Sequence, residues 1–126
     1  MSQLIRHLKF QHRLELIRPL AERWLEALSP MADLPMRLIP VPMDRRSLRE
    51  RGFNAAVEIA RVIGRNLNIA SDVKRVVKVR RTPPQSTLSA KQRACIRSGV
   101  FQSIAPTTEG LIAVVDDVVT STETAR

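Results

Sequence analysis

The fold is decided by the stretch Leu111-Ile112-Ala113-Val114-Val115-Asp116-Asp117-Val118-Val119-Thr120-Ser121-Thr122-Glu123-Thr124. It opens with a continuous apolar run, which is typical of a buried parallel strand. Two carboxylates follow at once, and a hydroxyl-rich turn then begins a helix. Ligands of open parallel sheets bind outside the carboxyl ends of the strands, so the stretch predicts a binding site. Carboxylates accept hydrogen bonds from ribose hydroxyls, while helix-start amides and Ser or Thr hydroxyls bind phosphate, which favours a phosphorylated sugar as ligand.

The N-terminal part is predicted to be helical. Apolar residues recur at helical spacing from Leu4 to Leu28, and we expect an interruption near Pro19, because proline removes a helical hydrogen bond. Trp24 falls on the apolar face, where it is interpreted as a core anchor. The apolar run from Met36 to Pro42, bounded by prolines, then predicts a buried parallel strand.

The segment from Asp44 to Asn54 is interpreted as an arginine-rich loop that opens into a helix, with Asn54 as its N-cap. The apolar face of that helix consists of Ala55, Ile59, Ala60, Ile63 and Leu67. Further strands are predicted over Val73 to Val79, Gly99 to Ile104 and Leu111 to Val115, with an irregular loop at 82–88 and a helix from Ser89 to Arg97. This alternation indicates an α/β fold with a mainly parallel sheet flanked by helices.

Size and charge restrict the class of protein. A chain of 126 residues predicts a single domain, with a helical segment at 1–30 and an α/β core at 36–126. No apolar run approaches the roughly 20 residues of a membrane span, so a cytoplasmic protein is expected. The net charge of +9 attracts polyanions or phosphorylated small molecules, whereas 3% aromatic residues disfavour stacking on single-stranded nucleic acid. Cys95, the one cysteine, forms neither an internal disulfide nor a zinc site by itself and is interpreted as a half-buried helix residue.

Between Val73 and Arg97 the chain carries basic residues with no acidic residue among them. Such a run is ordinarily a solvated face, but the absence of interleaved acids also fits contact with phosphate or nucleic acid. Both interpretations are open at this point.

These motifs resemble a known family. The strand-to-helix stretch resembles the PRPP-binding loop of type I phosphoribosyltransferases, usually written D-D-V-x-T-T-G-x-T. Three other segments are similar, in order and spacing, to ComF/GntX proteins, so that the resemblance covers about residues 8 to 124. They are Leu8-Lys9-Phe10, then Pro40-Val41-Pro42 with Arg51-Gly52-Phe53-Asn54, and Thr82-x-x-Gln85-x-x-Leu88-x-x-x-x-Arg93 leading to Gly99-Val100-Phe101.

The resemblance implies a role for each segment. Asp116 and Asp117 would be the catalytic pair that holds the ribose hydroxyls of PRPP, directly or through Mg²⁺-bound water. Mg²⁺ would bind pyrophosphate oxygens and water rather than a direct protein ligand. The remaining implied roles are a phosphate cradle of Thr120, Ser121, Thr122, Glu123 and Thr124, a pyrophosphate loop with Arg45, Arg46 and Arg51, and a mobile loop with Arg80, Arg81, Gln85 and Arg93.

The chain departs from the family pattern at several positions. Thr122 stands where the motif has glycine. The pattern Thr120-Ser121-Thr122-Glu123 also fits a capping box, which would satisfy the helix start internally and close the phosphate site, as the alternative to retained PRPP binding. Ala55 replaces a usual Gln and Ile96 a usual Asn, and no cysteine zinc ribbon precedes the domain. Members of the family continue into a further helix and strand, so this fold is expected to be truncated at the C-terminus. The sheet edge exposed by the truncation would allow two copies to associate as a homo-oligomer.

Two functions therefore remain open from the sequence. One is a Mg²⁺-dependent phosphoribosyltransferase that binds PRPP or another phosphorylated ribose and displaces pyrophosphate through positioning and electrostatics. The other is a catalytically inactive, nucleic-acid-associated accessory protein in DNA uptake or utilisation, which would bind DNA through non-specific phosphate contacts.

Overall fold

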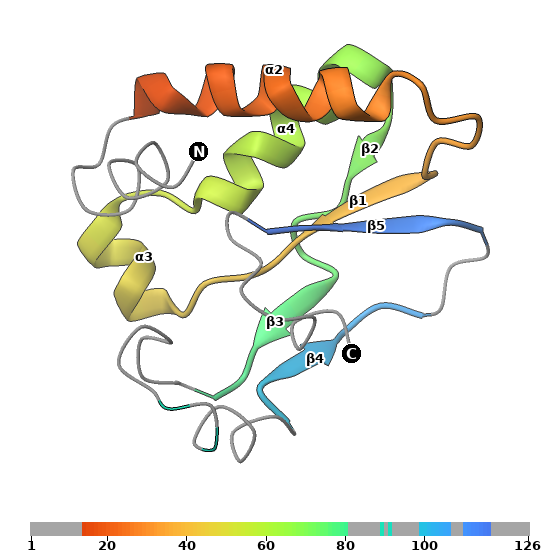
Figure 1. Ribbon diagram of the computed structural model, residues 1–126. Helices are drawn as coiled ribbons and strands as arrows, with labels where there is room; N and C mark the ends of the chain where they lie inside the picture. The colour runs from red at the N-terminus through yellow and green to blue at the C-terminus, as the bar shows by residue number, and fades with distance from the viewer. Residues whose placement is uncertain (1–13, 81–88, 90, 92–98, 107–109, 117–126) are drawn as a thin grey trace.

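The structure, a computed structural model, describes residues 14–80, 89, 91, 99–106 and 110–116 (Figure 1). The predictions for Asp117, the phosphate cradle at 120–124, Cys95 and most of the helix from Ser89 to Arg97 concern residues outside these ranges. The described elements are η1 (Leu14–Leu16), α2 (Ile17–Leu28), β1 (Arg37–Pro40), α3 (Arg45–Arg51), α4 (Ala55–Leu67), β2 (Ala70–Ser71), β3 (Val76–Lys78), β4 (Phe101–Ser103) and β5 (Ile112–Val115).

A parallel sheet of three strands, in the order β2-β1-β5, forms the centre of the fold. β1 pairs with β5 from Arg37 opposite Ile112 to Pro40 opposite Val115. The predicted strands at 36–42 and 111–115 are therefore confirmed as β1 and β5, and the α/β fold class with them. Residues 38–40 of β1 are buried, as expected for the central strand of the sheet, which has a neighbour on each side.

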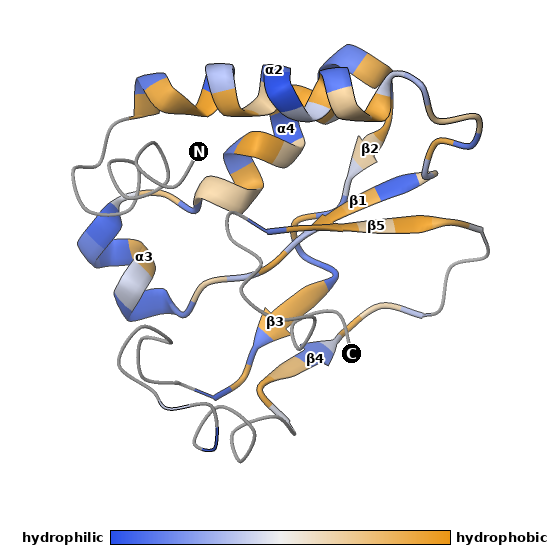
Figure 2. Cartoon of the chain, in the orientation of Figure 1, coloured by the Kyte–Doolittle hydropathy of each residue, from blue (hydrophilic) through white to orange (hydrophobic). Residues whose placement is uncertain are grey.

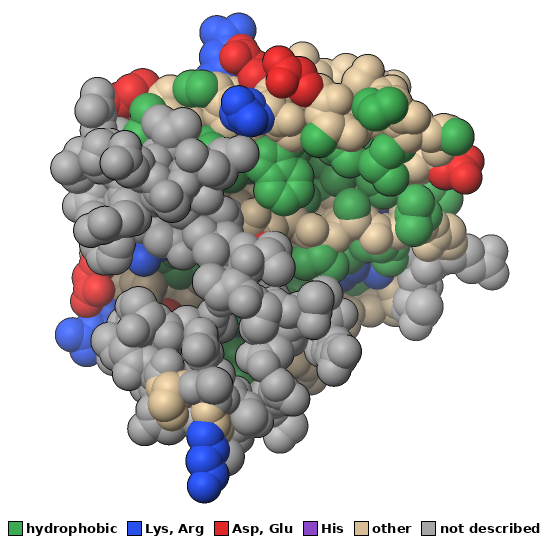
Figure 3. Space-filling view, in the orientation of Figure 1, with side chains coloured by type: hydrophobic (Ala, Val, Ile, Leu, Met, Phe, Trp, Pro, Cys, Tyr) green, Lys and Arg blue, Asp and Glu red, His purple; other side chains and the backbone are tan. Residues whose placement is uncertain are grey.

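Helix α4 covers one face of this sheet, and α2 packs on α4 (Figure 1). Side chains from the three layers form one buried cluster that includes Leu20, Leu38, Ile59, Ile63 and Val115. Trp24 packs against this cluster and is half-buried, which confirms it as a core residue. Charged side chains lie on the outer surface of α2, with apolar side chains below the helix (Figure 3).

The expected interruption near Pro19 is wrong within the described part of the chain. Helix α2 runs without a break from Ile17 to Leu28, and Pro19 lies in its first turn. The amides of the first turn have no partner inside the helix, so proline costs nothing there. The change of geometry falls earlier, where the short 3₁₀ turn η1 gives way to α2.

The segment interpreted as an arginine-rich loop contains a helix, α3, over Arg45–Arg51. Asp44 caps its start, since the Ser47 amide donates to Asp44 Oδ1 at 2.9 Å. Gly52 ends it in the left-handed conformation with φ of 81°, which glycine adopts without strain. The helix has no buried residue and is hydrophilic along most of its length (Figure 2), so apolar periodicity gave no signal for it.

Helix α4 begins where its sequence predicts. The Ala56 amide donates to Asn54 Oδ1 at 3.0 Å, which confirms Asn54 as the N-cap. At the other end Gly64 allows the chain to turn back closely, because a Cβ there would lie 2.6 Å from the carbonyl oxygen of Ile69. The chain then forms β2, whose Ser71 hydroxyl donates to the Ala60 carbonyl of α4 at 3.0 Å.

Strands β3 and β4 form a separate antiparallel ribbon rather than extending the parallel sheet. The predicted strands at 73–79 and 99–104 thus exist in part but pair with each other. The edge strand that does extend the parallel sheet, Ala70–Ser71, was not predicted. Alternate residues of a strand face opposite sides, so Ile39 and Val114, which neighbour the ribbon residues Val76 and Phe101, lie on the face away from α4.

No helix among the described residues combines the length and the apolar character needed to cross a membrane.

Candidate functional site

The carboxyl ends of β1 and β5 lie side by side, which places two predicted site segments at one edge. Pro40 is opposite Val115, and the Val41 amide donates to the Val115 carbonyl at 2.9 Å. Asp116 is the next residue along β5 and is half-buried. The structure therefore brings Asp116 beside the segment that leads from β1 into α3, as the sequence predicted for an open parallel sheet.

Side-chain hydrogen bonds fix the segment after β1. Asn54 Nδ2 donates to the Val41 carbonyl at 2.9 Å, while its Oδ1 caps α4. Asp44 accepts from the Ser47 amide at Oδ1 and from the Ser47 hydroxyl at Oδ2, each at 2.9 Å. Asn54 thus ties the start of α4 to the carboxyl edge of β1, and Asp44 fixes the start of α3 directly after that edge.

The arginines of α3 differ in what they contact. Arg46 Nε lies 2.8 Å from Glu50 Oε1, so the charge of Arg46 has an acidic partner one turn away. Arg45 and Arg49 are exposed and four residues apart, which puts them on one side of the helix. Arg51 is half-buried. Arg45, Arg46 and Arg51 were predicted as site residues from the sequence, but Arg49 was not, because its spacing from Arg45 becomes informative only once the segment is known to be helical.

The ribbon reaches the same edge through Lys78. Its Nζ lies 3.9 Å from Asp44 Oδ2, and the two side chains are only 15% and 18% exposed. Arg80 follows on the exposed continuation of β3. The other residues assigned to the mobile loop, Arg81, Gln85 and Arg93, lie outside the described residues.

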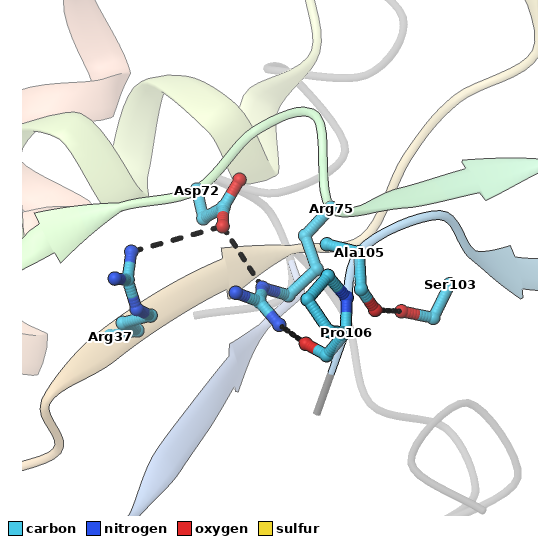
Figure 4. Close-up of polar contacts among 6 residues, drawn as sticks. All are labelled: Arg37, Asp72, Arg75, Ser103, Ala105 and Pro106. Atoms are coloured by element: carbon cyan, nitrogen blue, oxygen red, sulfur yellow. Dashed lines mark hydrogen bonds and ion pairs between the residues drawn. The ribbon is translucent and has the colours of Figure 1, made fainter. Parts of the chain in front are cut away.

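A second polar cluster holds the start of the ribbon (Figure 4). Arg75 Nε donates to Asp72 Oδ2 at 2.9 Å and Arg75 Nη1 to the Pro106 carbonyl at 2.7 Å, while Arg37 Nη1 lies 3.9 Å from Asp72 Oδ2. The Arg75 hydrogen bond holds the pKa of the Asp72 carboxyl below its ordinary value, against the opposing effect of desolvation.

These contacts correct the interpretation of the basic run as a uniformly solvated face. Arg75 and Lys78 are 11% and 15% exposed, and both face carboxylates that precede the run in sequence. In the described part of the run, two cations therefore have acidic partners that lie outside the run, Asp72 and Asp44. Lys74 and Arg80, by contrast, are exposed, as the solvated interpretation expects.

An apolar hollow lies between the sheet and the ribbon at this edge. It is lined by residues 39–42 of β1 and its continuation, by Val114 of β5, and by Val76 and Phe101 of the ribbon. Phe101 and Val114 are 38% and 49% exposed, so the ribbon covers this face less tightly than the helices cover the other.

Among the described residues no group of three or more His, Cys, Asp or Glu side chains gathers into a metal site. Asp116 is one carboxylate at the end of β5. Magnesium usually keeps several waters beside substrate phosphates, so Asp116 would reach a Mg²⁺ ion that arrives with a phosphorylated ligand through one of those waters.

Comparison with known proteins finds relatives along nearly the whole chain. DNA utilization protein YhgH of Salmonella typhimurium is 32% identical over 129 residues, which cover 98% of this chain and 57% of that protein. YhgH of Escherichia coli K12 is 33% identical with the same coverage, and Competence protein F of Haemophilus influenzae is 31% identical, covering 98% of this chain and 58% of that protein. The chain thus spans somewhat over half the length of these curated relatives. No family model matches the chain, and no solved structure matches it.

Proposed function

This chain belongs to the ComF/GntX family of competence and DNA utilization proteins, and on that premise we propose that it binds PRPP or a related phosphorylated ribose at the carboxyl edge of its parallel sheet. The observation that carries the proposal is the hydrogen bond from the Val41 amide to the Val115 carbonyl, 2.9 Å long. It joins the end of β5, where Asp116 follows, to the segment that leads into the arginine helix α3.

The two sides of this edge suit the two ends of such a ligand. Asp116 accepts hydrogen bonds from the ribose hydroxyls, because a carboxylate is an acceptor with two oxygens. Arg45 and Arg49 extend from α3 as exposed cations and neutralise the pyrophosphate. Arg46 contributes less, since Glu50 already offsets its charge.

Bound Mg²⁺ would supply charge neutralisation at the pyrophosphate oxygens. The protein's own part is to hold the sugar at Asp116 and to keep the α3 arginines at a fixed distance from it. Displacement of pyrophosphate by an acceptor is the reaction that this arrangement favours, because positioning and electrostatics can accelerate it without a covalent nucleophile.

Isothermal titration of PRPP with Mg²⁺ tests the proposal. The parent protein is expected to show saturable binding, and Asp116→Asn to weaken it by about tenfold or more, since a charged acceptor is replaced by a neutral amide that also donates. Asp33→Asn is the matched control, because Asp33 is an exposed carboxylate in the turn before the amino end of β1. Equal affinity of Asp116→Asn and the parent would contradict the assignment of the ribose site.

A second candidate is supported by the names of the relatives and by the exposed arginines of α3. As a DNA-associated accessory protein, the chain would contact the phosphate backbone without reading sequence. The salt dependence of binding and the effect of Asp116→Asn distinguish the two candidate functions. DNA binding would fall steeply as salt rises and be indifferent to Asp116→Asn, whereas PRPP binding depends on Mg²⁺ and on that carboxylate.

A further inference from the structure

Among the described cations of the basic run, Lys78 has a side chain that is largely buried beside the carboxyl edge of β1. It occupies the end of β3, opposite Phe101 of β4, and its side chain is 15% exposed. Its ammonium reaches Asp44, the residue that begins α3 after the carboxyl end of β1. A cation that stands 34 positions away in sequence is therefore brought between the ribbon and the arginine helix.

The contact with Asp44 leaves the ammonium with hydrogen-bonding capacity. At 3.9 Å the Nζ to Oδ2 separation is an ion pair and is longer than a hydrogen bond. Asp44 already accepts from Ser47 at both carboxylate oxygens. An ammonium has three donors, and among the described residues Asp44 is the one polar partner of the Lys78 ammonium.

We infer that Lys78 is a further anion-binding residue of this edge, which contacts a phosphate or pyrophosphate group, and that Asp44 is the internal counterion that holds its ammonium in place before the ligand binds. The inference rests on the proposed function for the location of the site, and it adds a ligand-binding residue that the sequence motifs did not indicate. Helix α3, which carries Arg45 and Arg49, begins directly after the same Asp44, so two separate elements would supply cations near the anion.

Partial burial strengthens the attraction between such a cation and a bound anion. Water screens the charge of an exposed side chain such as Lys74, whereas a side chain that is 15% exposed acts through a less polar medium. The Asp44 carboxylate offsets the cost of burying the ammonium but also repels an incoming anion. Removing the negative charge of Asp44 while keeping its helix cap should therefore strengthen anion binding.

The experiment titrates inorganic pyrophosphate with Mg²⁺ into the full chain and three variants. Lys78→Met keeps the apolar stem and is expected to weaken pyrophosphate binding by about tenfold, the loss of one charge-assisted contact. Lys74→Met removes the same charge from an exposed position of the same run and is expected to change affinity less than about twofold. Asp44→Asn keeps a cap oxygen for the Ser47 amide and is expected to tighten binding severalfold.

Thermal melts without ligand show which variants fold, and Asp44→Asn keeps the inference testable if Lys78→Met does not. The inference is overturned if the parent does not bind pyrophosphate, if Lys78→Met and Lys74→Met bind alike, or if Asp44→Asn binds more weakly than the parent. Loss of PRPP binding alone, with pyrophosphate binding intact and sensitive to Lys78, would instead contradict the ribose site. Binding of PRPP that depends on Asp116 but not on Lys78 would leave the proposed function standing without this residue.

Discussion

On one face of the parallel sheet α4 and α2 bury Leu38 and Val115 to 2% and 3% exposure, whereas on the opposite face Val114 of the same strand as Val115 stays 49% exposed. The first face is held by apolar side chains from α2, α4 and two strands. On the second face the ribbon is attached at one end by Arg75 to Asp72 and at the other by Lys78 to Asp44. A continuous apolar core supports one side, whereas on the other side the ribbon buries Ile39 but leaves Val114 half exposed, and charged contacts hold its ends.

The difference shows where stability and ligand recognition are separated in this molecule. Burial of apolar surface is non-directional and cooperative, so the helix-covered face sets the global free energy of unfolding. Charged contacts at partly exposed sites contribute little to stability, but they fix the positions of other charges. The charged side chains proposed to bind the ligand lie at the carboxyl edge and on the ribbon side, where small changes in contact do not unfold the core.

The largest expected effect tests the stability half of this comparison. Ile63→Ala removes a side chain that is 1% exposed at the centre of α4, and the cavity should lower the free energy of unfolding by roughly 3 kcal/mol. Val114→Ala, on the ribbon face, should cost less than about 1 kcal/mol, because half of that side chain already contacts water. Urea unfolding followed by circular dichroism measures both. Similar losses in the two variants would mean that the ribbon face is packed as firmly as the helix face.

A smaller effect is expected at Asn54, where the two regions meet. Asn54→Ala removes both the cap of α4 and the hydrogen bond to the Val41 carbonyl, and should cost about 1–2 kcal/mol by urea unfolding. Asn54→Asp keeps an acceptor for the Ala56 amide but cannot donate to Val41 when ionised, so its loss should be smaller. If Asn54→Asp is as destabilising as Asn54→Ala, the link to Val41, rather than the cap, fixes this part of the edge.

The sequence predicted the helix-covered face well because its signals are local. The continuous apolar run of β5 and the apolar face of α4 each specify an element without reference to the rest of the chain. Asn54 before that face marked the helix start correctly. The position of Asp116 at the carboxyl end of a parallel strand also followed from local pattern and from the general geometry of open sheets.

Helix α3, the edge strand β2 and the ribbon were predicted poorly because their structure depends on contacts between distant residues. α3 buries no side chain, so it lacks apolar periodicity, and its ends are set by Asp44 and Gly52. β2 consists of Ala70 and Ser71 alone, and such a short strand exists only because β1 lies beside it. Nothing in the basic run itself indicates that Lys78 meets Asp44, since a pairing over that separation is a property of the fold.

The smallest expected effect concerns the attachment of the ribbon at Asp72. The Arg75 hydrogen bond lowers the pKa of Asp72 below its ordinary value of 3.8 in the folded protein. The unfolded chain therefore takes up a proton at Asp72 at a higher pH than the folded protein does. The stabilisation from this contact is present in full above about pH 5 and is lost as the pH falls through about 4 and then through the lower folded value.

Urea unfolding of the parent and of Asp72→Asn, repeated from pH 6 down to pH 3, measures this contribution. The parent should be the more stable at pH 6, and the difference between the two should shrink below about pH 4. When both proteins also carry Arg75→Met, which removes the main donor, the pH dependence of that difference should shrink, and Arg37 and the Lys74 amide account for what remains. A difference that stays constant over the whole range would show that Asp72 holds the ribbon through neutral hydrogen bonds alone. In that case, charge would contribute nothing at this end of the ribbon, and the contrast between the two faces would rest on apolar packing only.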